Sequence, residues 1–312
     1  MPVYNDWAAA QKLLAGIDAA LVTVPCKGRV LMVNDASTEE FKEDLTQRFS
    51  QVNDVWILHL RRNLGHQRAI AMGLVYVYQN WPGLDAVVVM DADGEDRPQD
   101  IPALLACFNA RSGREVVFAA RTKRLESPIF RSFYNMYRGL HKILTGISVR
   151  VGNFSVLPPQ ALSRLMVVSE LWNHYAAAVF RARIPHTSIP LARGTRLAGH
   201  SKMNFVSLLV HGLSAISVFS DVVGARLLAV AALAIVFAVV LVAVVAGVRL
   251  FTDLAIPGWA TYVTGILLIV VAQALIVSLA LVFIIVNGRA VPSFLPIRDA
   301  AFFIDRVERI DG

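Results

Sequence analysis

Two long stretches without a charged residue restrict the fold of this chain more than any other feature of its sequence. They cover residues 227–248 and 261–286. As α-helices with a rise of ~1.5 Å per residue, both are long enough to cross the ~30 Å hydrocarbon core of a bilayer. The chain of 312 residues is 56% hydrophobic with a mean hydropathy of +0.55, which is unusually apolar for a soluble protein. The sequence therefore predicts a hairpin of two transmembrane helices, with the lipid bilayer as a partner.

The charges that flank these helices predict their orientation. The link at 249–260 carries one Arg and one Asp, whereas the opposite ends are flanked by Lys202, Arg226, Arg289 and Arg298. Because positive residues accumulate on the cytoplasmic side of membrane proteins, we expect both termini in the cytoplasm of a multi-pass inner (plasma) membrane protein. The start of the chain lacks the apolar segment of a signal peptide, so none is expected.

Strands and helices alternate along the first 202 residues. Apolar, β-branched runs predict strands at 29–33, 55–60, 86–90, 116–120, 152–157 and 184–192, and helical spacing predicts helices at 7–21, 67–78 and 101–108. This alternation is typical of a doubly wound α/β sheet. Residues 2–6 have the character of the loop after a first strand. We expect that strand's own beginning to be missing, or the sheet to do without it.

A cluster of carboxylates follows the predicted strand at 86–90. Asp91, Asp93, Glu95 and Asp96 lie within six residues of one another, where they repel unless a cation or hydrogen-bond donors separate them. In open α/β sheets the ligand crevice lies at the carboxyl ends of the strands. The hard oxygens of Asp91, Asp93 and Glu95 suit Mg²⁺ or Mn²⁺, which would in turn hold a diphosphate. The alternative is a solvated acidic turn, but the strand before it and the helix after it favour the metal site.

Three other segments each allow two interpretations. Asp35 follows a strand and either accepts from a nucleotide base or belongs, with Ser37, to a helix cap. The basic loop 61–66 precedes a helix and either contacts a diphosphate or is merely solvated. The helix predicted at 128–147 is amphipathic and lies either on a membrane surface or against the core with a basic outer face.

The net charge narrows the choice of partners. A charge of +7 and a pI near 9.7 fit either nucleic acid or an anionic membrane surface. No basic patch interleaved with aromatic residues is visible, so the membrane is favoured and no nucleic-acid partner is expected. The two cysteines, Cys26 and Cys107, lack metal-type spacing and are expected to be reduced thiols.

Taken together, the motifs resemble those of the inverting GT-A glycosyltransferases of family 2 that load a sugar onto a polyprenyl phosphate. The resemblance covers nearly the whole chain. It rests on residues 2–6, 34–37, 62–65, 91–93 with 97–98, Arg121, the helix at 131–137, residues 199–202 and the two C-terminal apolar helices. The chain departs from these relatives at Asn34 and Glu95, where an Asp and a Gln are usual, and at Asn153 and Ser155, where an Asp and an Arg are common.

The resemblance implies a Rossmann-like GT-A mixed sheet with flanking helices, a nucleotide sugar of the UDP-glucose or GDP-mannose type as donor, and Mg²⁺ or Mn²⁺ as cofactor. It implies a cytosolic catalytic domain at 1–202, a juxtamembrane amphipathic helix at 203–221, the two membrane helices within 222–287 and a cytosolic tail at 288–312. It leaves homo-oligomerisation open. The residues implied in catalysis are Asp91, Asp93, Arg121 and Arg131. Those implied in substrate binding are Pro2, Tyr4, Asn5, Asp35, Arg62, Asn63, Arg196, Ser201 and Lys202. Those implied in metal binding are Asp91, Asp93 and Glu95.

The acceptor distinguishes the rival functions. A phosphate is already ionised at pH 7 and needs no general base, whereas the hydroxyl of another lipid or glycan would need one. A processive synthase is disfavoured because the chain contains no Arg-Trp dipeptide of the expected channel signature. An inactive membrane scaffold would not need the carboxylate cluster. A transporter is the weakest alternative, because Gln273 is the one polar group near the middle of a predicted span apart from hydroxyls, and it suits a contact between helices.

Overall fold

The computed structural model describes two compact units of the chain. It describes residues 1–39, 41, 49–121, 139, 142–146, 151–197, 213–252, 258–290 and 294–310, with the backbone alone at 121 and 287–290. The first unit comprises Met1–Asn135, Ser148–Val218 and Ser293–Gly312. The second comprises Met136–Ile147 and Phe219–Pro292.

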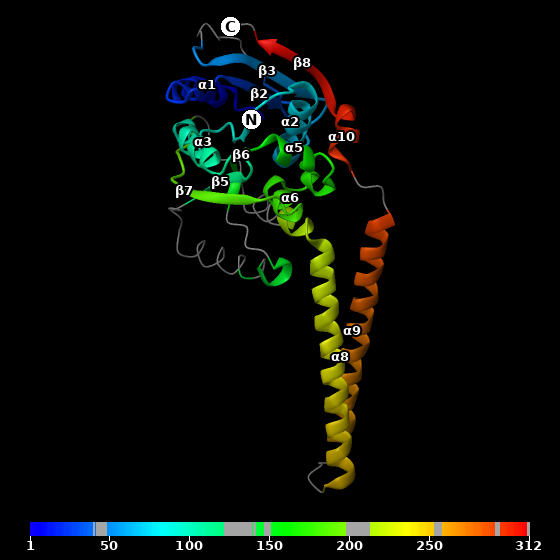
Figure 1. The fold of residues 1–312 in the computed structure, drawn as a ribbon. Coiled ribbons are helices and arrows are strands. Elements are labelled where there is room, and N and C mark those ends of the chain that lie inside the picture. Colours follow the sequence, from blue (N-terminus) through cyan, green and yellow to red (C-terminus); the bar gives the residue numbers. More distant parts are fainter. Residues whose placement is uncertain are drawn as a thin grey trace. The chain divides into compact units, whose positions relative to one another are not determined.

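The first unit contains a four-stranded sheet in the order β1-β2-β3-β8 (Figure 1). Its strands are β1 (Pro2–Val3), β2 (Gly28–Asn34), β3 (Val52–Leu60) and β8 (Ile304–Ile310). The first three run parallel, and β8 pairs antiparallel with β3. β2 is buried along its last five residues, as expected of a parallel strand that is covered on both faces.

A second four-stranded sheet in the same unit has the order β4-β6-β5-β7. Its strands are β4 (Val87–Val89), β6 (Val151–Leu157), β5 (Val116–Arg121) and β7 (His186–Leu191). β6 is antiparallel to both of its neighbours, whereas β5 and β7 are parallel. The unit is therefore a mixed α/β fold, which confirms the predicted fold class.

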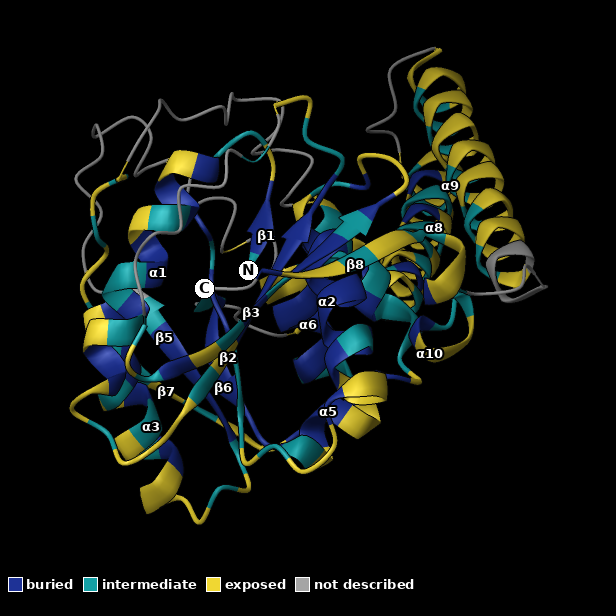
Figure 2. Ribbon diagram, turned by 90° about the horizontal axis from the view of Figure 1, so that it is seen from above, coloured by how far each residue is buried: buried dark blue, intermediate teal, exposed yellow. Residues whose placement is uncertain are grey.

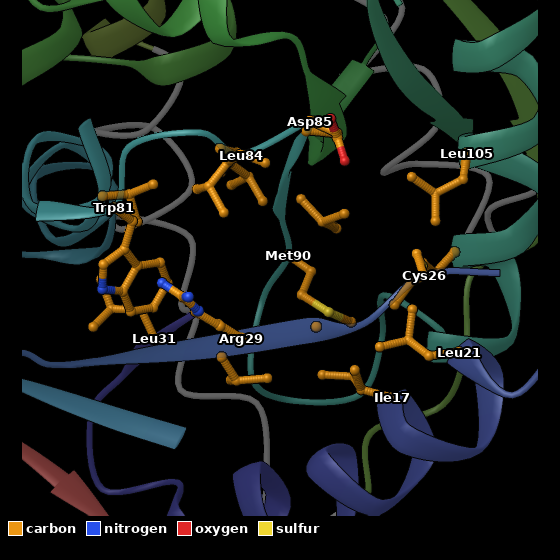
Figure 3. A pocket seen from close by; sticks show the side chains of 18 of the residues that line it. Ile17, Leu21, Cys26, Arg29, Leu31, Trp81, Leu84, Asp85, Met90 and Leu105 are labelled. Carbon is orange, nitrogen blue, oxygen red and sulfur yellow. The ribbon is translucent and has the colours of Figure 1, made fainter. Parts of the chain in front are cut away.

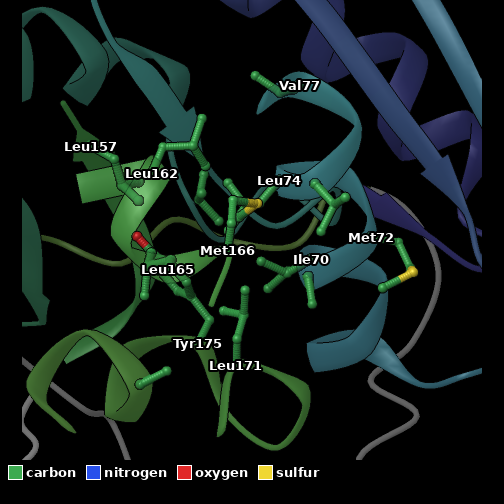
Figure 4. Packing of buried hydrophobic residues seen from close by; sticks show 14 of the residues in the cluster. Ile70, Met72, Leu74, Val77, Leu157, Leu162, Leu165, Met166, Leu171 and Tyr175 are labelled. Atoms are coloured by element: carbon green, nitrogen blue, oxygen red, sulfur yellow. The ribbon is translucent and has the colours of Figure 1, made fainter. Parts of the chain in front are cut away.

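Helices cover both faces of the strands and enclose two apolar clusters. One cluster joins α2 (His66–Asn80), α5 (Pro159–Leu165) and α6 (Tyr175–Arg181), and its side chains meet in Figure 4. The other joins α1 (Trp7–Leu21) and α3 (Ile101–Ala110). Alternate residues of β2 enter opposite clusters, because successive side chains of a strand point to opposite faces. The central strand β2 is accordingly buried over most of its length, whereas β8 at the edge of its sheet carries exposed residues (Figure 2).

Short helical turns complete the first unit. They are η1 (Pro98–Asp100), η2 (Ser169–Trp172), α10 (Pro296–Asp299) and η3 (Ala300–Phe302). The helices predicted at 128–147 and 203–221 fall largely outside the described residues. Within them, the structure describes helical residues at 142–145 and 213–217. The strand β8 was not predicted from sequence. β1 is present but has only two residues.

The second unit is a hairpin of two long helices, α8 (Ser220–Phe251) and α9 (Trp259–Ala290), which lie side by side (Figure 1). A side chain added at Gly224 would meet Ile285, so the small residue allows the two helices to approach closely there. Large apolar side chains such as Phe237 and Phe283 are exposed. The segments Ser220–Phe251 and Trp259–Val286 are long and apolar enough to cross a membrane. This agrees with the predicted hairpin and indicates that the protein is associated with a membrane.

Candidate active site

Loops that follow the parallel strands meet at one edge of the first unit. Asn5, directly after β1, accepts hydrogen bonds through Oδ1 from the backbone N–H groups of Thr38 (2.9 Å) and Glu39 (3.1 Å). Its own N–H donates to Ser37 Oγ at 3.0 Å. Asn5 and Ala36 both have left-handed backbones, with φ of 52° and 53°. Non-glycine residues rarely adopt this conformation, and it is found preferentially at functional sites, where contacts of this kind hold it in place.

Asp35, at the end of β2, holds the next loop along the edge. Its carboxylate is buried and accepts from the N–H groups of Leu64 (2.6 Å) and Gly65 (2.9 Å). Burial raises the pKa of Asp35, and these two hydrogen bonds act in the opposite direction. Asn63 also donates from Nδ2 to the Asp35 carbonyl at 3.1 Å. Asp35 therefore fixes the loop before α2 and leaves the side chains of Arg62 and Asn63 exposed.

The carboxylates of Asp91, Asp93 and Asp96, after β4, differ in their hydrogen bonds. Asp96 is buried and accepts the N–H of Asp91 at 2.9 Å, so it closes the loop. Asp93 accepts the N–H of Glu95 through Oδ1 at 2.9 Å. Gly94 lies between them with φ of 87°, a conformation that glycine adopts without strain. These bonds present Asp91 and Asp93 at the surface of a defined turn.

A basic segment is attached to this acidic turn through its backbone. The N–H of Gly194 donates to the Glu95 carbonyl at 2.8 Å, and the N–H of Leu197 donates to the Asp93 carbonyl at 2.9 Å. A side chain at Gly194 would collide with the Gly94 carbonyl, so the contact requires glycine. The attachment brings the segment after β7 against residues about a hundred positions earlier in the chain.

Cationic side chains face the carboxylates of the turn. Arg193 pairs with Glu95. Arg196 lies 3.7 Å from Asp93 Oδ2 and also donates to Asp6 Oδ2 at 3.2 Å. These pairs relieve the repulsion among the carboxylates.

His66, the first residue of α2, lies 3.0 Å from Asp91 Oδ1. Burial alone lowers the pKa of His66, but the charge of Asp91 and its hydrogen bond outweigh burial, so the pKa is raised. The side chain of His66 is 42% exposed, so solvent weakens this pair. His66 therefore brings a partly screened positive charge to the same edge of the sheet.

A chain of buried polar groups supports His66 and Asp91 from behind. The Asn153 amide lies 2.9 Å from His66 Nε2 and 3.4 Å from Asp91 Oδ1. Gln67 donates to Asn153 Oδ1 at 3.1 Å and accepts the N–H of Tyr175 at 2.8 Å. Asn153 is thus integrated into the core of this chain, where the resembling enzymes commonly have an Asp.

The oxygen atoms of Asp91, Asp93 and Glu95 are of a type that binds a divalent cation, but the three side chains are not arranged around a common point. Oxygen ligands of this kind suit Mg²⁺ and Mn²⁺. Among the residues that the structure describes, however, no three His, Cys, Asp or Glu side chains converge on a point that could hold a metal ion. Asp91, Asp93 and Glu95 instead face His66, Arg196 and Arg193, respectively.

The site residues predicted from sequence fall into three groups. Asn5, Asp35, Asn63, Asp91, Asp93, Glu95 and Arg196 are joined by the contacts given above, and Arg62 belongs to the same loop as Asn63. Pro2 pairs with Val33 in the sheet, and Tyr4 is exposed beside Asn5. Arg121 ends β5 and is described by its backbone alone. Arg131, Ser201 and Lys202 lie outside the described residues.

The list of site residues predicted from sequence omits four residues that the structure places at the site, namely Asp6, His66, Asn153 and Arg193. His66 had a usable signal, because it directly follows the loop motif at 62–65 and opens a helix. Asp6 belongs to the motif at 2–6, and Asn153 stands where the resembling enzymes commonly have an Asp, so both were marked without being given a role. Arg193 had no signal, since its partner Glu95 is remote in sequence.

Comparisons with known proteins bear on the family of this chain. A family model described as Glycosyl transferase family 2 matches residues 1–165. YkcC, an uncharacterised glycosyltransferase of Bacillus subtilis (strain 168), is 27% identical over 272 residues, which are 84% of this chain and 80% of YkcC.

Relatives that carry a more specific name are also similar. The undecaprenyl-phosphate 4-deoxy-4-formamido-L-arabinose transferase of Klebsiella pneumoniae is 26% identical over 216 residues, which are 67% of this chain and 63% of that enzyme. The enzyme of the same name from Salmonella paratyphi A is 28% identical over 218 residues, with coverages of 67% and 63%. The match thus spans less than two thirds of these named enzymes. The family model covers more than half of this chain, and the chain belongs to glycosyltransferase family 2.

Proposed function

We propose that this protein is a membrane-bound inverting glycosyltransferase that moves a sugar from a nucleotide sugar to polyprenyl phosphate. The observation that carries the proposal is that Asp91 and Asp93 lie beside cationic side chains where the strand-end loops meet. The chain also belongs to family 2 and has two helices long and apolar enough to cross a membrane. The names of the Klebsiella and Salmonella relatives, which refer to undecaprenyl phosphate, support a lipid phosphate as acceptor.

The nucleotide sugar would bind along the edge formed by Asn5, Asp35 and the loop before α2. Arg62 and Asn63 are exposed there, next to the N-terminus of α2, which attracts anions. Asp35 already accepts two backbone hydrogen bonds, and each carboxylate oxygen retains a lone pair for a base N–H. A uridine or guanosine donor would fit this chemistry, with Pro2 and Tyr4 at the border of the site.

A divalent cation would be held by Asp93 with Asp91, and Mg²⁺ or Mn²⁺ matches these oxygen donors. When bound, such an ion supplies positive charge to the leaving nucleoside diphosphate. Glu95 is less suited to the task than the sequence suggests, because Arg193 pairs with its carboxylate. Asp96 is committed to the N–H of Asp91 and keeps the turn in shape.

The acceptor reaction needs little proton transfer. An oxygen of the polyprenyl phosphate would attack the anomeric carbon of the sugar, and the bond from that carbon to the nucleoside diphosphate would break, which inverts the anomeric centre. Because the phosphate is already ionised, the protein's part is to hold two anions in line and stabilise the leaving charge. Arg196, which lies beside Asp93, is proposed to serve this role, and Arg121, Arg131, Ser201 and Lys202 are proposed to complete the anion-binding surface.

The membrane arrangement follows from the flanking charges. We propose that residues 1–202 form the catalytic domain in the cytoplasm, that 203–221 lie along the membrane surface, and that the tail at 288–312 is also cytoplasmic. In this arrangement the protein sits in the inner (plasma) membrane and serves assembly of cell envelope glycans.

The experiment that tests the function is a donor and acceptor screen. Membranes that contain the protein would be incubated with labelled nucleotide sugars and polyprenyl phosphate, polyprenol or no acceptor, and the lipid fraction would be analysed. We expect labelled lipid with polyprenyl phosphate alone, and its loss with Asp93→Asn. Product with polyprenol would assign a hydroxyl acceptor, and a folded protein that neither transfers nor hydrolyses any donor would indicate an inactive scaffold.

A further inference from the structure

A line of three polar side chains crosses the first sheet beside the candidate active site. They are Asn34 at the end of β2, His59 in β3 and Glu308 in β8. Two residues further from the site, the same face of these strands carries apolar side chains of the cluster around α1 and α3, namely Met32, Ile57 and Ile310. The face therefore changes from apolar to polar at one step in all three strands.

The apolar part of this face is an ordinary core. Ile17 and Leu21 of α1 lie beside β2 there, and with Met90 they line an opening between β2 and β4 (Figure 3). More apolar side chains at the next step would have extended this core, because buried polar groups are tolerated only when they find partners. The change to polar residues, directly before Asp35, suggests a task other than packing.

Hydrogen bonds join the three side chains end to end and continue into the site. His59 Nε2 lies 2.7 Å from Glu308 Oε1, and His59 Nδ1 lies 3.0 Å from Asn34 Nδ2. On its other side, Asn34 accepts the N–H of Ser37 through Oδ1 at 2.9 Å. Ser37 Oγ in turn accepts the N–H of Asn5 at 3.0 Å. The line thus connects β8, which follows α9 in the chain, to two loops of the candidate active site.

One arrangement of protons satisfies this line. The N–H of Ser37 can only donate, so the amide oxygen of Asn34 faces Ser37 and the amide NH₂ faces His59. That NH₂ group can also only donate, so His59 Nδ1 accepts and the ring proton lies on Nε2, which donates to Glu308. An Asp, which is usual at position 34 in the resembling enzymes, could not donate to Nδ1. Asn34 and His59 are therefore matched to each other.

The turn held by this line contains the carboxylate proposed to receive the nucleoside. Asp35 lies within it, and Ala36 has a left-handed backbone with φ of 53°, which a non-glycine residue keeps only where contacts hold it. The side chain of His59 is 12% exposed, so its bond to Asn34 is largely shielded from water and fixes the amide firmly. Glu308 is 45% exposed, so its bond orients the ring but adds little to stability.

We infer that His59 and Glu308 are positioning residues for the nucleotide sugar, an inference that rests on the proposed function. Glu308 orients the imidazole ring, the ring orients the amide of Asn34, and the amide holds the turn 35–37 in the shape that presents Asp35 to the nucleoside. Both residues act through Asn34 and need no contact with the donor. The strand that follows α9 thereby contributes a side chain to donor binding.

The test uses two replacements of His59 that each keep one of its hydrogen bonds. In His59→Asn the amide oxygen takes the place of Nδ1 and accepts from Asn34, whereas the longer side chain of His59→Gln reaches Glu308 instead. Binding of UDP and GDP to the detergent-solubilised full chain with Mg²⁺ would be measured by calorimetry, beside KM and kcat for the donor.

We expect His59→Gln to weaken binding of the nucleotide that the wild-type protein prefers by about tenfold and to raise the donor KM equally, with kcat and Tm little changed. His59→Asn should stay within about threefold of the wild-type affinity, because it keeps the bond that holds Asn34.

Glu308 is tested in the same way. Glu308→Ala should weaken nucleotide binding by about threefold or more, and Glu308→Gln should restore it, because an amide oxygen still accepts from Nε2. The matched control Glu115→Ala removes a partly exposed glutamate paired with Arg111 and should have no effect. In the nucleotide-free proteins, hydrogen exchange of a peptide covering 34–39 should be about fivefold faster in His59→Gln and Glu308→Ala than in the control.

Several results would overturn the inference. They are equal nucleotide affinities in wild type, His59→Gln and Glu308→Ala, unchanged exchange of the 34–39 peptide, and losses of affinity that follow Tm alike in His59→Asn and His59→Gln. Sugar transfer to polyprenyl phosphate with equal affinities would reject this inference and keep the proposed function. Nucleotide binding that depends on His59, without transfer to polyprenyl phosphate, would keep the inference and reject that function. A wild-type protein that binds neither nucleotide would reject both.

Discussion

Among single residues, Asp93 links the acidic turn to the basic segment after β7. It shapes its own turn through the N–H of Glu95, and its other oxygen faces Arg196, which also contacts Asp6. Asp93→Asn should preserve the turn, because an amide oxygen can accept the same hydrogen bond. It removes the charge that a divalent cation would need.

We expect Asp93→Asn to lower transfer activity about 100-fold or more, equivalent to ~2.7 kcal/mol of lost transition-state stabilisation. Addition of excess EDTA to the wild-type protein should have a similar effect. The matched control is Glu115→Gln, which changes a partly exposed carboxylate that pairs with Arg111 before β5. Full activity in EDTA, or equal effects of the two substitutions, would contradict the proposed metal role.

Among the elements, β8 shows how a segment remote in sequence completes the first sheet. It pairs along β3, where Glu308 contacts His59 at 2.7 Å and Arg309 contacts Asp54 at 2.5 Å. These polar contacts are partly exposed and contribute little to stability. The buried contact is made by Ile310, which is 7% exposed and belongs to the cluster around α1 and α3.

Ile310→Ala should therefore destabilise the first unit by about 2–4 kcal/mol, because it removes buried methylenes and leaves a cavity. The control Arg306→Ala changes an exposed side chain of the same strand and should change stability by less than about 0.5 kcal/mol. Thermal unfolding followed by near-UV circular dichroism reports on the packed core. Similar Tm values for the two variants would show that β8 is not anchored through Ile310.

The basic segment after β7 is a second element whose position depends on remote contacts. Gly194 and Gly94 allow its backbone to touch the acidic turn, and a side chain at Gly94 would collide with Leu197. The charges of Arg193 and Arg196 reach the carboxylates only because this backbone contact exists.

At the scale of the whole molecule, the proposed topology depends on the α8–α9 hairpin. The proposed arrangement places the turn near Gly258 outside the membrane and both termini in the cytoplasm. For a test, Cys26 and Cys107 would be replaced by Ser and single cysteines introduced at Ala260 or Gly312. A membrane-impermeant maleimide should label the first variant in intact cells and the second only after permeabilisation. The reverse pattern would invert the proposed orientation.

The sequence by itself determined the features that depend on local pattern. The uncharged runs at 227–248 and 261–286 predicted the hairpin, because length and hydropathy alone decide whether a helix suits a bilayer. Apolar runs that end in polar residues predicted the strands of the mixed α/β fold. The same pattern predicted that Asn5, Asp35 and Asp91 lie at one edge of the sheet. The reason is general: the carboxyl ends of parallel strands share an edge whatever the details of packing.

Tertiary structure alone decided which side chains meet at that edge. Asp6 and Arg196 are 190 positions apart, and His59 and Glu308 are 249 apart, so neither pair leaves a periodic signal. Asp35 was open to two roles in the sequence, and neither of them revealed that its carboxylate accepts two N–H groups of the loop before α2. The carboxylates of the acidic turn suggested a metal site as neighbours in sequence, yet in three dimensions they face three different cationic side chains. The physical reason is that the close packing of the folded chain decides which remote side chains come into contact. Local sequence determines only the helices, strands and loops in which these side chains lie.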